Sequence, residues 1–293
     1  MTADSIRAVE LVQNDLRFPA LMAGDGEPVI LLHGFPDCHH NWQHQLVALA
    51  EAGYYALAPA LRGYHPDCQP ADRDYSLYAA VEDLCSMARQ LGGRVHLVGH
   101  DWGAAVGYLA CARSPEYFAS FSALAIPPLG QLPGALLKVP EQLWLSAYME
   151  FFQLPLVPDW WLQRNNFAGV ETLWQRWSPG WDGGDHLQQA KDVLAQPGVL
   201  TAALGWYRHL CRLWTSASRE TLRWLRQPIE VPVQCLLGRK DGCMSARLLE
   251  HCSGNQGFPA GLKVETLAGA GHFLHLERPD RVNELLLRHL SGR

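Results

Sequence analysis

The stretch Val98-Gly99-His100-Asp101-Trp102-Gly103-Ala104 decides the fold of this 293-residue chain. The apolar run 95–98 leads into it, and the helix-forming run 104–110 leads out. Glycines lie two residues before and two residues after Asp101, where a sharp turn from strand into helix leaves no room for a Cβ. The pattern predicts an elbow that holds Asp101 at positive φ as a carboxylate nucleophile. The alternative is an ordinary aspartate N-cap.

A second segment supports the nucleophile. The short apolar strand 29–32 ends in His33-Gly34-Phe35-Pro36. Such a strand end can aim a backbone amide at a reacting centre, and the residue after the nucleophile supplies another amide. We therefore expect an oxyanion hole made by the amides of Phe35 and Trp102. The alternative is a common strand-ending turn.

The C-terminal third supplies a base and an acid. His272 lies in a glycine-rich loop after the strand 264–267, and Asp241 lies in the turn after the strand 233–238. Asp241 would orient His272 and stabilise its charged form. The chain order nucleophile, acid, base agrees with an elbow of this kind. His275 shares the loop but lacks a preceding glycine, so it is the weaker choice of base.

With these motifs in order, the chain resembles an α/β-hydrolase of the epoxide hydrolase branch. The resemblance implies an α/β fold with a mostly parallel sheet, flanking helices and an inserted helical cap. The segments that carry the resemblance are His33-Gly34-Phe35-Pro36, Gly99-His100-Asp101-Trp102-Gly103, Gly238-Arg239-Lys240-Asp241, Gly271-His272, Trp42-Gln43-His44-Gln45, Leu61-Arg62-Gly63-Tyr64 and Leu276-Glu277-Arg278-Pro279. The first four of these segments are also shared with haloalkane and fluoroacetate dehalogenases.

A change of composition marks the expected cap. We expect residues 1–127 and 218–293 to form the core and residues 128–217 to form the cap. Nine of the eleven tryptophans fall in or just beyond this segment, and helical spacing appears at 143–148 and 200–207. Elsewhere the sequence predicts a hairpin over 8–24, strands at 54–58 and 122–126, and helices over 76–90 and from about residue 279.

The resemblance also implies two cap tyrosines that hold an epoxide oxygen. Tyr207 lies in Gly205-Trp206-Tyr207-Arg208, and Tyr148 begins a segment similar to the family's first-tyrosine segment. That segment departs from the family at Phe151, where a second tyrosine is common. The ordinary alternative for each tyrosine is a place in an aromatic core.

The side chains expected near Asp101 favour an epoxide over an alkyl halide as the substrate. Two phenols can stabilise an opening ring oxygen and protonate it. Halide-binding relatives carry a side-chain donor at the position of Phe35, and fluoroacetate dehalogenases carry arginines just after the nucleophile, where residues 102–105 have none. We therefore expect hydrolysis of a small apolar epoxide by water to a vicinal diol, through an alkyl ester on Asp101. The alternatives are a haloalkane dehalogenase and a non-catalytic binding protein on the same scaffold.

Composition excludes several other functions. The net charge of −5 and the lack of a basic stripe argue against a nucleic acid partner. We expect no cofactor and no metal, although Cys38, His39, His40 and His44 lie close together and the i,i+4 spacing of His40 and His44 suits zinc.

The eight scattered cysteines predict free thiols in a reducing cytoplasm. The segment 1–7 lacks the apolar core of a signal peptide, and the run 119–130 is too short to span a bilayer. We therefore expect no stable membrane association. A homodimer is an assembly state that the sequence allows.

Overall fold

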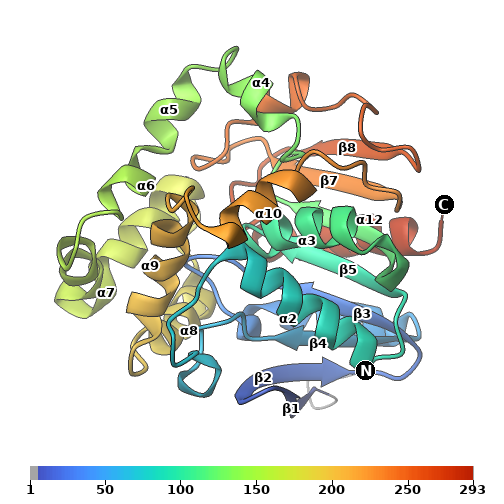
Figure 1. The fold of residues 1–293 in the computed structure, drawn as a ribbon, viewed down its shortest axis with the longest axis horizontal. Coiled ribbons are helices and arrows are strands. Elements are labelled where there is room, and N and C mark those ends of the chain that lie inside the picture. The colour runs from blue at the N-terminus through green and yellow to red at the C-terminus, as the bar shows by residue number, and fades with distance from the viewer. Residues whose placement is uncertain (1–5, 293) are drawn as a thin grey trace.

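The computed structural model describes residues 6–292. Residues 1–5 and 293 lie outside the described part, so the prediction about a signal peptide falls largely outside it. A central sheet of eight strands runs through the molecule in the order β1-β2-β4-β3-β5-β6-β7-β8 (Figure 1). Its strands are β1 (Arg7–Gln13), β2 (Leu16–Ala23), β3 (Glu27–Leu32), β4 (Tyr54–Pro59), β5 (Val95–His100), β6 (Phe118–Leu124), β7 (Val233–Gly238) and β8 (Leu262–Leu267).

The pairing of the strands is mostly parallel. The β1–β2 hairpin is antiparallel and adds to β4, while β4, β3, β5, β6, β7 and β8 pair in parallel. All six residues of β5 are buried, as expected for a parallel strand covered on both faces. The predicted α/β architecture and the predicted opening hairpin are confirmed.

Helices cover both faces of the sheet. On one face lie α2 (Leu77–Gln90) and α3 (Trp102–Arg113), whose side chains share a core with β5 and β6. On the other face lie α1 (Gln43–Glu51) and α12 (Pro279–Leu290), which pack against each other. Figure 1 shows α2 and α3 in front of the sheet. Short helical turns connect these elements: His39–Trp42, Pro66–Cys68, Pro115–Tyr117, Ala246–Glu250 and α11 (Leu274–Glu277).

One strand lies earlier than its pattern suggested. A strand was predicted at 122–126, but β6 runs from Phe118 to Leu124. Ala125 takes a positive φ of 65°, which turns the backbone out of the sheet before the two prolines that follow. The apolar character of Ile126 therefore reflects burial beside the sheet and not strand pairing.

Seven helices lie between β6 and β7. They are α4 (Leu132–Leu136), α5 (Glu141–Leu145), α6 (Ala147–Phe151), α7 (Val157–Trp177), α8 (Gly184–Leu194), α9 (Val199–Leu210) and α10 (Ser216–Trp224). Residues 164–167 interrupt α7 with non-helical backbone angles. The helices α4 to α9 extend away from the sheet edge, whereas α10 packs back onto α2 (Figure 1).

The structure also shows the state of the cysteines and the character of the helices. All eight cysteines are free, as predicted, and seven are buried; Cys211, just after α9, is exposed. Among residues 6–292, no helix combines the length and the apolar character needed to cross a bilayer.

The elbow glycines give a stability prediction. A Cβ on Gly103 would lie 2.2 Å from the carbonyl oxygen of Leu32, so Gly103→Ala forces backbone to move. We expect the free energy of unfolding to fall by about 1–3 kcal/mol in urea titrations, as for other overpacked sites. Gly134→Ala on α4 is the control, because its Cβ would meet nothing within 4 Å. Equal effects of the two substitutions would contradict the close packing at the elbow.

Candidate active site

Asp101 lies between the end of β5 and the start of α3, at the predicted sharp turn. Its φ of 50° and ψ of −117° confirm the predicted positive φ, and its side chain makes no capping hydrogen bond to α3. A Cβ on Gly99 would lie 2.4 Å from the carbonyl oxygen of Gly103, so the turn requires these glycines. Asp101 is therefore no ordinary N-cap.

The Asp101 carboxylate is almost fully buried, with 6% of its surface exposed. The Phe35 amide donates to its Oδ1 over 2.7 Å, and its Oδ2 lies 3.6 Å from Nε2 of His272. A Cβ on Gly34 would lie 2.4 Å from Oδ1, so only glycine lets the strand end of β3 come this close. The two oxygens of Asp101 therefore have different surroundings, a backbone donor on one side and an imidazole on the other.

The loops after β7 and β8 bring the predicted acid and base together. Nδ1 of His272 lies 2.9 Å from Oδ2 of Asp241. The other oxygen of Asp241 accepts the amides of Cys243 and Met244 over 2.7 and 2.9 Å. These bonds hold Asp241 so that Nδ1 of His272 carries a proton toward it and Nε2 faces Asp101.

Charge dominates the state of His272. Full burial disfavours the charged ring, but the carboxylates of Asp241 and Asp101 outweigh burial and raise the pKa of His272 to about 10. With both carboxylates ionised, His272 is therefore an imidazolium at neutral pH. A neutral ring, which the predicted role as a base needs, would require the charge on Asp101 to disappear first.

His275, the other histidine of the loop, faces away from this group. Its Nε2 lies 3.4 Å from Oδ2 of Asp37, and Nδ1 of His100 lies 3.7 Å from the same oxygen. Nε2 of His100 also contacts the carbonyl of His272 at 3.0 Å. All three side chains are fully buried, so this second cluster supports the loop of His272 from behind.

The second cluster, Asp37 with His100 and His275, is also a group of side chains that could hold a metal ion. Among the described residues, Asp37, His100 and His275 form the group whose potential ligand atoms lie within 4.8 Å of one another. Cys38 and His40 are not part of it. Within the part of the chain that the structure describes, the zinc-like spacing of His40 and His44 does not bring them into a group of this kind.

The two predicted tyrosines face Asp101 across a cavity. The ring centroids of Tyr148 and Tyr207 are 5.8 Å apart, and both residues line the cavity with Asp101. The Tyr207 hydroxyl has no partner in the described structure, and the Tyr148 hydroxyl lies 3.5 Å from Sγ of Cys243. Burial raises the pKa of both phenols well above the usual value, so both are neutral donors at physiological pH.

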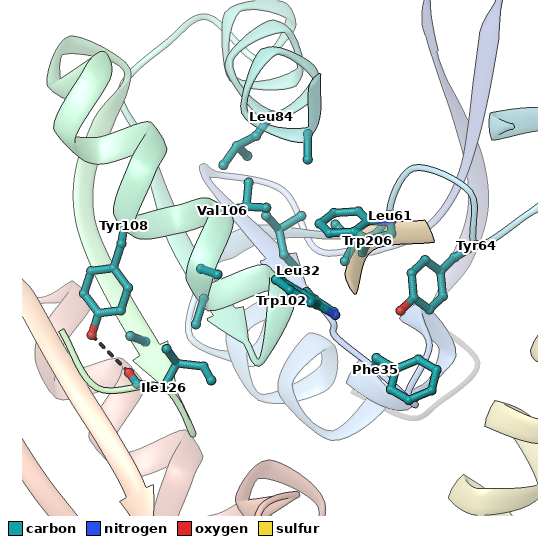
Figure 2. Packing of buried hydrophobic residues seen from close by; sticks show 14 of the residues in the cluster. Leu32, Phe35, Leu61, Tyr64, Leu84, Trp102, Val106, Tyr108, Ile126 and Trp206 are labelled. Carbon is teal, nitrogen blue, oxygen red and sulfur yellow. Dashed lines mark hydrogen bonds between the residues drawn. The ribbon is translucent and has the colours of Figure 1, made fainter. Parts of the chain in front are cut away.

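The cavity has a volume of about 450 Å³ and lies between α3 and the inserted helices. Asp101 is the only charged residue in its lining, and nine leucines supply most of the apolar wall: Leu77, Leu109, Leu129, Leu132, Leu136, Leu143, Leu210, Leu222 and Leu225. Figure 2 shows Trp102 beside Trp206, with its indole nitrogen on the side of Tyr64 and Phe35. That nitrogen is buried and has no hydrogen-bond partner in the described structure.

The other residues of the predicted oxyanion loop have supporting contacts. Nε2 of His33 accepts the amide of Leu61, and burial lowers the pKa of His33 to about 4, so the ring is neutral. The carbonyl of Pro36 accepts the indole N–H of Trp174 on α7 over 2.8 Å. These contacts fix the loop that presents the Phe35 amide.

Sequence patterns do not reveal the residues that join the inserted helices to the loops of Asp241 and His272. Gln142 on α5 is fully buried; its side chain donates to the carbonyl of Cys243 and accepts the amide of Ser245, each over 2.8 Å. The carbonyl of Trp177 at the end of α7 accepts the amides of Gly242 and His272 over 3.0 Å. A lone glutamine in a short helix matches many surface patterns, and a carbonyl carries no sequence signature.

Comparison with known proteins gives a consistent result. A family model described as alpha/beta hydrolase family matches residues 29–285. Epoxide hydrolase A of Mycobacterium tuberculosis is 30% identical over 319 residues, covering 95% of both chains. An AB hydrolase superfamily protein of Bacillus subtilis is 29% identical over 99% of both chains.

Solved structures agree with these relatives. An epoxide hydrolase of Vigna radiata is 26% identical, with a TM-score of 0.85 over the full length of both chains. A Bacillus megaterium epoxide hydrolase in complex with an inhibitor is 27% identical, with a TM-score of 0.81 over 97% of this chain and all of that one.

The charges around His272 give a pH prediction. A pKa of about 10 means that His272 favours the folded state fully below pH 6.5, and that this contribution is lost as the pH rises toward 10. Asp101→Asn removes one of the two raising charges, so we expect the pKa of His272 to fall. NMR titration of its ring proton would measure the change. Asp67→Asn, an exposed carboxylate, should leave that pKa unchanged; an unaltered value in Asp101→Asn would contradict the coupling.

Proposed function

Since this chain belongs to the α/β-hydrolase family, in the branch of the epoxide hydrolases, we propose that it hydrolyses an apolar epoxide to a vicinal diol. The observation that carries the proposal is one cavity that holds a buried carboxylate and two neutral phenols. Asp101 is the nucleophile, Tyr148 and Tyr207 hold the ring oxygen, and His272 with Asp241 activates water. No cofactor takes part in these steps.

The surroundings of the two Asp101 oxygens support Oδ2 as the attacking atom. Oδ1 is held by the Phe35 amide, whereas Oδ2 accepts no backbone bond and lies 3.6 Å from His272. Oδ2 attacks the epoxide carbon and breaks the carbon–oxygen bond of the ring. Oδ1 becomes the carbonyl oxygen of the ester. The departing ring oxygen takes a proton from a tyrosine hydroxyl, for which the unpartnered Tyr207 is well placed.

Ester formation then changes the state of His272. Asp101 loses its negative charge, so one cause of the raised pKa of His272 disappears. The imidazolium proton restores the tyrosine hydroxyl, and the imidazole is left neutral. Hydrolysis therefore becomes available only after alkylation, because only then can Nε2 act as a base.

Hydrolysis restores the resting enzyme. Nε2 of His272 takes one proton from water, and the oxygen attacks the ester carbonyl. The amides of Phe35 and Trp102 stabilise the negative charge that develops on Oδ1. When the intermediate collapses, the second water proton goes to the departing alkoxide. The diol leaves, and Asp101 is again a carboxylate beside an imidazolium.

One observation is also compatible with a second reaction, the dehalogenation of an alkyl halide. The buried Trp102 indole N–H has no partner and could donate to a departing halide. Phe35 offers no side-chain donor beside it, and the two phenols have no use in halide release. These features favour the epoxide. The buried Asp101–His272–Asp241 group also argues against a purely binding role.

The arrangement of helices supports a division of the chain into a core and a cap. We propose that residues 128–217 act as a cap that supplies both tyrosines, on a core formed by 1–127 and 218–293. The cytoplasmic location and the homodimer stay predictions from the sequence.

The two half-reactions should separate at His272. His272→Gln keeps the carboxylate and the phenols but has no base, so it should react once and stall as an ester. Intact mass should rise by the full mass of a styrene-oxide probe, whereas an alkyl halide would add only its alkyl group. In the parental enzyme, a single turnover in ¹⁸O water should label Asp101. Label in the diol of that turnover would refute the covalent route.

The tyrosines should act on the first half-reaction. Loss of one donor to a developing oxyanion costs about 2–4 kcal/mol, so Tyr207→Phe and Tyr148→Phe should each slow ring opening about 30- to 10³-fold. The double variant should be nearly inactive in single-turnover experiments. Tyr117→Phe, outside the cavity lining, is the matched control. A double variant that opens epoxides at the parental rate would refute the roles of the tyrosines and favour the dehalogenase.

A further inference from the structure

Three leucines of the cavity wall are also exposed to solvent. Leu143 on α5 is 67% exposed, Leu210 at the end of α9 is 36% exposed, and Leu222 on α10 is 43% exposed. Side chains that line a cavity and are also largely exposed to solvent are expected where the cavity opens. The mouth therefore lies between α5 on one side and the α9–α10 segment on the other.

Large apolar side chains continue outward from this mouth. Leu137 is 88% exposed, Trp144 76%, Leu213 60% and Trp214 74%. We call these four, together with the three exposed leucines of the wall, the mouth rim. It holds seven of the twelve exposed large hydrophobic residues in the described structure. Soluble monomers seldom expose so many apolar side chains together unless something binds there.

The α9–α10 side of the mouth rim is positively charged on a chain that is negative overall. Residues 210–226 carry four arginines and one glutamate, while the whole chain has a net charge of −5. On the other side Lys138 is exposed next to Leu137, while α5 and α6 carry Glu141 and Glu150, so that residues 137–152 and 210–226 together hold five cations and three carboxylates. Leucine and tryptophan flanked by arginine and lysine are typical of a surface that rests on lipid, with cations near the anionic headgroups.

Two partners could cover the apolar mouth rim: a lipid bilayer or a second copy of the chain. The position of the rim at the cavity opening favours the bilayer. If the proposed function holds, a second copy seated on the rim would close the route by which the epoxide enters. A bilayer is instead the phase in which an apolar epoxide dissolves. We propose that the mouth rim docks reversibly on the surface of a lipid bilayer, so that the cavity takes its apolar substrate directly from the membrane.

Vesicle sedimentation tests this docking without any turnover. The full chain is mixed with large vesicles of phosphatidylcholine, with and without phosphatidylserine. We expect parental protein to sediment with the vesicles, more strongly when phosphatidylserine is present. Replacing two interfacial tryptophans by serine, Trp144→Ser with Trp214→Ser, should weaken the partition about tenfold or more, because less apolar surface then leaves water.

A matched variant and a charge variant complete the experiment. Trp160→Ser removes a tryptophan that is 62% exposed on α7, outside the rim, and should bind vesicles like the parent. Arg219→Gln with Arg223→Gln should weaken binding to phosphatidylserine vesicles and spare the weaker binding to pure phosphatidylcholine. Thermal unfolding of each variant checks that the fold is retained.

Two results would overturn the docking proposal. One is a parental chain that sediments with neither vesicle. The other is a dimer, seen by light scattering, that the double tryptophan variant abolishes while Trp160→Ser keeps it. Because sedimentation needs no substrate, an inactive chain that binds vesicles would refute the proposed reaction and leave docking intact. An active chain that does not bind vesicles would refute docking and leave the proposed reaction intact.

Discussion

The structure around the site depends on the compensation of one buried charge. A carboxylate removed from water costs several kcal/mol unless hydrogen bonds and opposite charge replace the solvent. Asp101 receives a backbone donor from Phe35 on one oxygen and an imidazolium on the other. The imidazolium in turn needs Asp241, which is held by two backbone amides. The loops after β3, β5, β7 and β8 therefore meet at one edge of the sheet.

The covalent step of the proposed mechanism would change this compensation. While Asp101 is charged, His272 holds a proton that it cannot easily release. In the proposed mechanism, an ester at Asp101 removes that charge from the same contact and so lowers the pKa of His272, while Asp241 keeps its contact with the ring. In the proposed mechanism, the same 3.6 Å separation would let His272 stabilise the Asp101 carboxylate before alkylation and act as a base after it.

Features with a local signature could be predicted from the sequence. The glycines of the elbow, the apolar runs of β3, β5 and β7, and the chain order of Asp101, Asp241 and His272 all lie within short stretches. The contacts that unite distant segments could not be predicted. Gln142 meets Cys243 across 101 residues, and Asp37 meets His275 across the length of the core. Their partners are defined only once the sheet has brought the loops together. The start of β6 was missed because burial beside a sheet and pairing within it favour the same apolar residues.

The burial of seven of the eight cysteines has a practical consequence for spectroscopy. Cys211 alone is exposed, and it follows α9 directly, next to Leu210 at the opening of the cavity. A maleimide dye or a nitroxide would therefore attach at one place in the folded chain without removal of any native thiol. The unaltered protein thus offers a single reporter position on its helical insertion, from which movements of α9 relative to the sheet can be followed in real time.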